Sequence, residues 1–228
     1  MIGDDIMKID NAIIKHYLKN VLFINGTAYA GKSTMVTMLA DQYGLLKCGE
    51  NYHTKYASQI ITPERQPNMC YFDTMKDWQE FVNRTPEEYE KWILGVEREA
   101  AELEIAELIH ISQNQKVIVD TNIPLDILRE ITDYHQVAIM LSPQHMSVDK
   151  FFEREDPEKV FLKKQIMQAV EPEKTMENFK SCIARINSKE KYIEYVESGF
   201  FTLVRNDADT DTKAETLDKL AKHFKLKG

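Results

Sequence analysis

Residues 26–33 read Gly26-Thr27-Ala28-Tyr29-Ala30-Gly31-Lys32-Ser33 and fit the pattern G-x-x-x-x-G-K-[ST] at every fixed position. In this pattern the glycines let backbone N–H groups approach phosphate oxygens, and the lysine ammonium meets the β- and γ-phosphates. The final hydroxyl takes one coordination position on Mg²⁺. The segment therefore predicts a site for a nucleoside triphosphate.

A loop of this kind follows a buried strand and opens a helix, and the sequence supplies both neighbours. Upstream, residues 21–24 read VLFI, an apolar run typical of a strand covered on both faces. Downstream, apolar residues recur at helical spacing from Met35 to Tyr43, and Gly44 ends the predicted helix. The N–H groups at the start of this helix would then face the phosphates.

Composition excludes several classes of protein. Hydrophobic residues make up 43% of the 228 residues, and no apolar run approaches the roughly 18 residues needed to span a membrane. The N-terminus lacks a signal-peptide pattern, and Cys48, Cys70 and Cys182 lack metal-like spacing, which predicts reduced thiols and a cytoplasmic location. The net charge of −8 disfavours nucleic acid as a partner.

Strands and helices alternate around the loop. Further strands are expected at residues 45–49, 117–120, 137–141 and 200–204, and helices at 5–19, 124–131 and 212–224. This alternation predicts a parallel sheet with right-handed crossovers.

Residues 51–115 form a long insertion between two predicted strands. It should contain a helix capped at 73 or 74 and running to 81, followed by a helix from Thr85 to about Ile111. Thr85, Pro86 and Glu88 fit the capping box of the longer helix. Its strongly acidic face is interpreted as solvated, with a basic partner as the alternative.

Residues 147–197 are expected to be helical in two or three pieces, divided near Pro157 and Pro172. Phosphoryl transfer needs positive charge around the migrating group and exclusion of water, and a mobile helical lid often supplies both. Arg154 and Arg185 are the candidates for that clamp. The alternative for each is a solvated surface charge.

Asp120 ends an apolar strand downstream of the loop, where an acid beside Mg²⁺ is expected, so Ser33 and Asp120 are the predicted metal ligands. An Asp that only caps the next turn is the alternative. Thr121 follows in place of a second acid, and an N-K-x-D motif is missing. Both features favour transfer to an acceptor over hydrolysis or guanine-specific switching.

A polar cluster follows the second predicted strand and is the candidate acceptor site: Glu50, Tyr52, His53 and Lys55. Glu50 stands at the carboxyl end of the strand, the edge of a parallel sheet where ligands collect. It could orient an acceptor hydroxyl or take its proton. An ordinary loop acid is the alternative reading of Glu50.

The chain resembles the P-loop nucleotide and small-molecule kinases, the class that contains adenylate, cytidylate and shikimate kinases. GTAYAGKST at 26–34 resembles their phosphate loop, and VIVDTNIP at 117–124 resembles their strand ending in Asp-Gly-Phe-Pro. KYIEYVESGFFTLVRND at 191–207 resembles the helix after the lid, the last strand and the adenine-side loop. The resemblance implies an α/β three-layer P-loop fold whose five-stranded parallel sheet has the order 2-3-1-4-5.

The same resemblance implies one domain with a core of residues 20–50, 116–146 and 198–228, an acceptor-binding insertion at 51–115, and a lid with a following helix at 147–197. The implied nucleotide-binding set is Gly26, Thr27, Ala28, Tyr29, Ala30, Gly31, Lys32, Ser33, Thr34, Asn206 and Asp207.

The predicted activity is ATP- and Mg²⁺-dependent transfer of the γ-phosphoryl group to a small hydroxyl-bearing metabolite or nucleotide. The predicted catalytic residues are Lys32, Glu50, Asp120, Arg154 and Arg185. Two alternatives stay open: a nucleotide-binding regulatory protein that acts through a protein partner, and a nucleic-acid end kinase, which the net charge disfavours. The acceptor and the formation of a homodimer are also open.

Overall fold

A computed structural model describes residues 8–153, 157–205 and 211–227. Three of the predicted site residues, Arg154, Asn206 and Asp207, lie outside these ranges. Within the described ranges, no helix is both long enough and apolar enough to cross a membrane.

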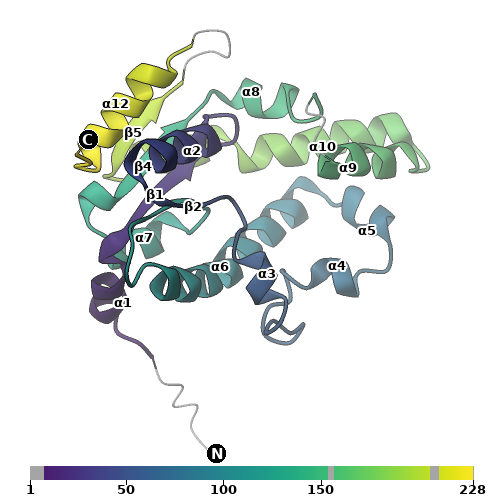
Figure 1. Cartoon of the computed structure of the whole chain (residues 1–228). Helices are drawn as coiled ribbons and strands as arrows, with labels where there is room; N and C mark the ends of the chain where they lie inside the picture. Colours follow the sequence, from purple (N-terminus) through teal and green to yellow (C-terminus); the bar gives the residue numbers. More distant parts are fainter. Residues whose placement is uncertain (1–7, 154–156, 206–210, 228) are drawn as a thin grey trace, which may run out of the picture.

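Five parallel strands form one sheet in the order β2-β3-β1-β4-β5, which confirms the predicted fold class (Figure 1). The strands are β1 (Val21–Gly26), β2 (Leu46–Cys48), β3 (Val117–Asp120), β4 (Val137–Leu141) and β5 (Phe201–Val204). Every residue of β1, β3 and β4 is buried, as expected for continuous apolar strands covered on both faces. Asp120 pairs in register with Ile24, so its carboxylate emerges beside the end of β1.

Helices cover both faces of the sheet. On one face α2 and α12 pack against Leu22, Ile24 and Ala138, and on the other α1, α6, α7 and α11 pack against Val21, Phe23 and neighbouring strand residues. The bounds of these helices are α1 (Asn11–Tyr17), α2 (Lys32–Tyr43), α6 (Pro86–Ile111), α7 (Leu125–Ile131), α11 (Lys189–Val196) and α12 (Lys213–His223).

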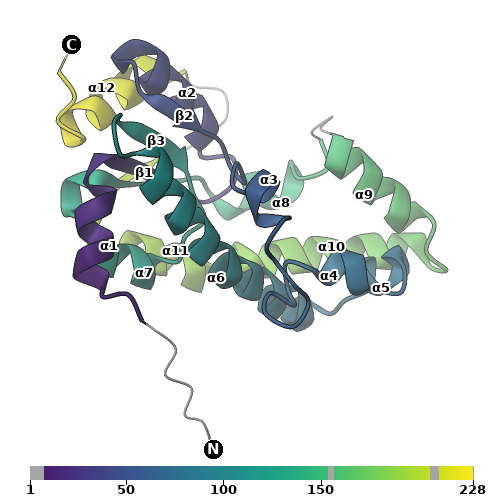
Figure 2. The same ribbon diagram turned by 60° about the horizontal axis from the view of Figure 1, so that its bottom comes forward.

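A second, helical core lies beside the sheet (Figure 2). It is built by α4 (Tyr71–Thr74), α5 (Trp78–Val82), α9 (Pro157–Met167), α10 (Pro172–Ile186) and the N-terminal part of α6. Phe81, Tyr89 and Phe179 are buried at its centre and their rings contact one another. Parts of the insertion (α4, α5 and the start of α6) and of the 147–197 segment (α9 and α10) therefore pack into one common core.

The remaining elements are short. They are the α-helices α3 (Thr54–Ala57) and α8 (Gln144–Asp149) and the 3₁₀ helices η1 (Leu18–Asn20) and η2 (Tyr134–Gln136).

Several predicted helix boundaries are wrong, and local capping explains each difference. The first helix starts at Asn11 because the Asp10 carboxylate accepts from the Ala12 N–H at 2.8 Å. The helix expected up to Phe81 is split into α4 and α5, because Asp77 caps α5 by accepting from the Gln79 N–H at 2.8 Å. In contrast, the capping box of α6 is present as predicted.

The described residues of the segment 147–197, 147–153 and 157–197, contain the end of α8 and then three further helices, one boundary more than the prolines predict. Pro157 and Pro172 begin α9 and α10, as expected from the tolerance of proline in a first helical turn. The additional boundary is at Ser188, whose side chain accepts from the Lys191 N–H at 3.3 Å and caps α11.

Candidate functional site

The 26–33 loop connects β1 to α2 with backbone conformations that favour glycine. Gly26 has φ +131°, and a Cβ there would lie 1.9 Å from the Met140 carbonyl oxygen of the neighbouring strand. Gly31 has φ +89° and caps α2, so the first N–H groups of the helix open toward the loop. The conformation therefore provides backbone donors for an anion.

Side chains outside the motif hold this loop in place. The Ser142 N–H donates to Thr27 Oγ1 at 2.8 Å, and Ser142 Oγ donates to the Ala28 carbonyl at 2.5 Å. Asn25 donates through Nδ2 to the Ile123 carbonyl at 2.8 Å and accepts from the Gly26 N–H at 2.6 Å. Sequence reasoning missed Asn25 and Ser142, because nothing local shows that strand ends far apart in the chain meet here.

Lys32, Ser33 and Asp120, all predicted site residues, lie together at the carboxyl end of β1 and β3. Ser33 Oγ donates to Asp120 Oδ2 at 2.7 Å, and Lys32 Nζ lies 3.8 Å from Asp120 Oδ1. Asp120 is 1% exposed, and its Oδ1 atom has no hydrogen-bond partner. Burial raises the pKa of Asp120, while Lys32 and the Ser33 hydrogen bond act in the opposite direction.

This arrangement fits a Mg²⁺ site that depends on its nucleotide. A carboxylate oxygen that accepts no hydrogen bond and an adjacent hydroxyl are oxygen ligands of the kind Mg²⁺ takes beside phosphates and water. Within the described residues, no group of three or more His, Cys, Asp or Glu side chains could hold a metal alone. Phosphate oxygens would therefore have to complete the coordination.

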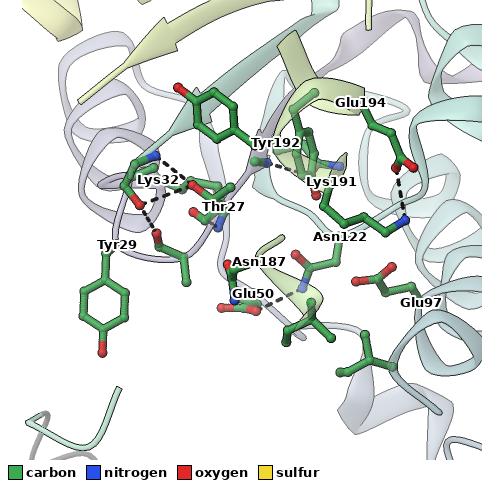
Figure 3. Close-up of a pocket in the computed structure, with 18 of the residues that line it drawn as sticks. Thr27, Tyr29, Lys32, Glu50, Glu97, Asn122, Asn187, Lys191, Tyr192 and Glu194 are labelled. Atoms are coloured by element: carbon green, nitrogen blue, oxygen red, sulfur yellow. Dashed lines mark hydrogen bonds and ion pairs between the residues drawn. The ribbon is translucent and has the colours of Figure 1, made fainter. Parts of the chain in front are cut away.

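A large cavity of about 1230 Å³ extends from the 26–33 loop (Figure 3). Its wall includes Glu50 and Asn51 after β2, Asn122 after β3, and residues of α6, α7, α9 and α11. Cavities for drug-sized ligands have about 300–1,000 Å³, so this volume has room for a nucleotide and a second small molecule.

Of the four residues predicted to bind the acceptor, only Glu50 lines the cavity, where it accepts from Asn122 Nδ2 at 3.0 Å. The Tyr52 hydroxyl donates to the Glu104 carbonyl at 3.3 Å, and burial raises its pKa. His53 is buried at the start of α3, and burial lowers its pKa. Lys55 is exposed on α3. The last three residues are not among those that line the cavity. Their role as acceptor ligands therefore stays a prediction that the cavity wall does not support.

Arg185, predicted to clamp the phosphoryl group, points to α6. Its Nε donates to Glu90 at 2.7 Å and its Nη1 to Glu87 at 2.8 Å. Glu90 lines the cavity, but Arg185 does not. A clamp role would require these two ion pairs to open and stays a prediction.

The expectation of a fully solvated acidic face on α6 is wrong. Glu104 is buried, and Glu97 is half-buried and lines the cavity. Burial raises the pKa of Glu97 to about 7, and nearby Lys191 and Arg98 act in the opposite direction. Helical spacing did place these acids on one helix, but which turns meet a cavity depends on the packing of α11.

The wall opposite Glu97 is another feature that sequence reasoning missed. It comes from α11, which contributes Lys191, Tyr192, Glu194 and Tyr195 to the cavity. Alternating charged and aromatic residues on a surface helix carry no local pattern that distinguishes a cavity wall from a solvated face.

A smaller cavity of about 230 Å³ lies on the other side of the loop. Ala30, Met35, Met140 and Leu203 give it an apolar wall. Arg205 lines both cavities and donates through Nη1 to the Tyr29 carbonyl at 3.3 Å. It directly precedes the predicted adenine-side residue Asn206 and was itself missed.

Comparison with known proteins adds no relative: no family model and no curated protein matches the chain. The protein contains a five-stranded parallel sheet in an α/β fold, and the strand order is consistent with a P-loop NTPase-like fold.

Proposed function

We propose that this protein is an ATP- and Mg²⁺-dependent phosphotransferase that moves the γ-phosphoryl group to a small-molecule acceptor. The observation that carries the proposal is the 1230 Å³ cavity, which continues from the 26–33 loop to Glu50 and on to α6 and α11. A protein that only binds or hydrolyses a nucleotide needs no room for a second molecule beyond the phosphates.

The triphosphate occupies the 26–33 loop in this proposal. Backbone N–H groups of the loop and the start of α2 bind the phosphate oxygens, and Lys32 neutralises charge on the γ-phosphoryl group. The base lies toward the smaller apolar cavity, beside Arg205. Ser33 and Asp120 would hold Mg²⁺, which would supply Lewis-acid stabilisation of the phosphate charge.

Glu50 is the group that acts on the acceptor. The acceptor hydroxyl oxygen attacks the γ-phosphorus, the bond from that phosphorus to the bridging oxygen breaks, and ADP leaves. Glu50 takes the hydroxyl proton, and the Asn122 amide holds the carboxylate in position at 3.0 Å. The proposal therefore assigns orientation and proton transfer to residues at the ends of β2 and β3.

One observation favours the regulatory alternative. Ile13 and Tyr17 lie four residues apart on α1 and are 51% and 53% exposed, and Ile9, before the helix, is 53% exposed. Such an apolar stripe is suited to a protein partner. In that case the nucleotide would bind tightly and turn over slowly whatever small molecule is added.

The test measures ADP release with and without a panel of nucleosides, nucleotides, sugars and amino alcohols. Lys32→Ala should lower acceptor-dependent kcat/KM by about 100-fold or more, and Glu50→Gln should lower kcat by about 100-fold while ATP affinity stays similar. Lys116→Ala is the matched control, because this exposed lysine precedes β3 at the end opposite Asp120.

Wild-type turnover in the Lys32 variant would contradict the proposal. Tight ATP binding without acceleration by any acceptor would support the regulatory alternative instead.

A further inference from the structure

The charge of the cavity beyond the phosphates identifies the kind of acceptor it suits. Figure 3 shows Glu50 joined to Asn122, with Glu97 beyond them as seen from Lys32. This part of the wall, formed by the end of β2, α6 and α11, is here named the acceptor chamber and is defined by Glu50, Asn122, Glu97, Lys191 and Tyr195.

Two of the cations that border the chamber already form ion pairs, and a third donates to a backbone carbonyl. Arg98 forms an ion pair with Asp126 of α7 at 2.7 Å, and Lys191 forms one with Glu194 at 3.0 Å. Arg129 donates through Nε to the Ser198 carbonyl at 3.1 Å. A phosphorylated acceptor would have to compete with these partners for positive charge.

Two carboxylates in the chamber, in contrast, form no ion pair among the described residues. Glu50 accepts a hydrogen bond from the neutral amide of Asn122. Glu97 forms no ion pair in the described part of the chain, because the nearby Arg98 and Lys191 pair with other carboxylates. Glu97 is also partly removed from water. Lys191 and Arg98 lie near Glu97 and lower its pKa, but their ion pairs are formed with Glu194 and Asp126. A partly desolvated carboxylate that forms no ion pair of its own is costly, so a bound cation would be favoured there.

We propose that the acceptor is a cationic amino alcohol, with its ammonium group on Glu97 and its hydroxyl group at Glu50. This inference rests on the proposed phosphotransferase function and adds the class of its substrate. The hydroxyl oxygen forms the new bond to phosphorus and gives its proton to Glu50, while the ammonium group keeps its protons and serves only for binding. Phosphorylated acceptors bind poorly because the unpaired charge of the chamber is negative.

Acceptor binding should depend on pH through Glu97. The pKa of Glu97 is about 7, so the carboxylate gains a proton as the pH falls through neutrality, and the affinity for a cation falls with it. The groups that face Glu97 are Arg98 on its own helix and Lys191, Glu194 and Tyr195 on α11. Asp126 of α7 is paired with Arg98.

The experiment uses matched probes that differ in charge. Ethanolamine, ethylene glycol and glycol phosphate form such a set, and the amine of ethanolamine stays protonated over the whole pH range tested. Acceptor-dependent ADP release by the protein should be fastest with the cationic member of the set. Its KM should rise about tenfold per pH unit below pH 7, as expected when one proton blocks binding.

Glu97→Gln tests the residue. This variant should raise KM for the cationic probe about tenfold or more at pH 8, leave kcat nearly unchanged and remove the dependence of KM on pH. Glu102→Gln is the matched control, since Glu102 is exposed on the same helix outside the cavity wall. Thermal unfolding of both variants checks that the fold is intact.

The outcomes separate the two proposals. Failure to bind ATP would contradict the phosphotransferase function and this inference together. ATP binding followed by preference for a neutral or phosphorylated probe, or by no acceleration with any probe, overturns the cationic acceptor. A Glu97 variant with unchanged KM and an unchanged pH profile overturns it as well.

Discussion

At the scale of single residues, Glu104 departs most from what its chemistry predicts. It is 4% exposed on α6, and its Oε1 atom has no hydrogen-bond partner. Burial raises the pKa of Glu104 to about 8, a hydrogen bond from Thr121 acts in the opposite direction, and the charges of Asp120 and Glu50 raise it further. At neutral pH the side chain therefore keeps its proton and adds no third negative charge beside Asp120 and Glu50.

Glu104→Gln should change how stability depends on pH. In the wild-type protein the folded state holds the Glu104 proton up to about pH 8, whereas the unfolded chain releases it near pH 4.5. Its contribution to the free energy of unfolding is full below pH 4.5 and falls as the pH rises through 8, at about 1.4 kcal/mol per pH unit at most. Gln does not titrate, so between pH 5 and pH 8.5 the variant should gain stability relative to wild type by about 4 kcal/mol.

Urea denaturation at pH 5 and pH 8.5 measures this difference. The exposed neighbour Glu102 provides the control, and Glu102→Gln should follow the wild-type curve at both pH values. Parallel curves for wild type and Glu104→Gln would show that Glu104 ionises as easily in the folded state as in the unfolded chain.

At the scale of the secondary-structure element, α6 connects the two cores. Its C-terminal part contributes Ala101 and Leu108 to the core under the sheet, and its N-terminal part contributes Tyr89 to the helical core. Between them, Glu99 accepts from Asn68 Nδ2 at 2.5 Å and from the Met69 N–H at 2.9 Å. The loop before α4 is therefore held on the middle of the helix.

The absence of a side chain at Gly95 lets Asn68 approach α6 closely. The effect of Gly95→Ala on stability should therefore have the opposite sign to the effect expected in an isolated helix. In an isolated helix Gly95→Ala would stabilise by about 1 kcal/mol. Here the new Cβ would lie 2.4 Å from Asn68 Nδ2, so Gly95→Ala should destabilise the protein by displacing Asn68 from Glu99. In an Asn68→Ala background the same change should stabilise by about 1 kcal/mol.

A double-mutant cycle measured by chemical denaturation gives the coupling. Equal effects of the Gly95 substitution in both backgrounds would mean that the position of Asn68 does not depend on the absence of a Cβ at Gly95.

At the scale of the whole molecule, the insertion and the predicted lid are mechanically linked. Phe179 of α10 contacts Phe81 of α5 and Tyr89 of α6, and Arg185 adds two ion pairs between α10 and α6. Movement of α10 would therefore have to carry α5 and the N-terminal part of α6 along, or break these contacts. A lid that closes alone is not what this packing favours.

Phe179→Ala should loosen both segments together. Phe179 is 1% exposed, and the cavity left by its ring should destabilise the helical core by about 3–5 kcal/mol. Hydrogen exchange should then accelerate in α5, α9 and α10 while β1, β3 and β4 stay protected. Leu39→Ala in α2 is the matched control, because Leu39 is fully buried in the core on the opposite face of the sheet. Faster exchange in α9 and α10 without α5 would contradict the link.

Local patterns were sufficient for most of the strands and for the 26–33 loop. β1, β3 and β4 are continuous apolar runs because both of their faces are covered. The glycines and the lysine of the loop act on the same phosphates and therefore stand close together in the sequence. Helix starts were predicted where proline or a capping box marks them, as at Pro86 and Pro172, and missed where a single Asp or Ser side chain forms the cap.

The wall of the cavity could not be read from local sequence. Spacing of 3.6 residues per turn shows which acids of α6 share a face. The packing of other elements against α6 decides that Glu104 is buried and that Glu97 borders the cavity, and the packing of α10 decides that Arg185 is paired. The loop chemistry is encoded within eight consecutive residues, whereas the charge of the acceptor chamber is a sum over segments 50–194 brought together by packing.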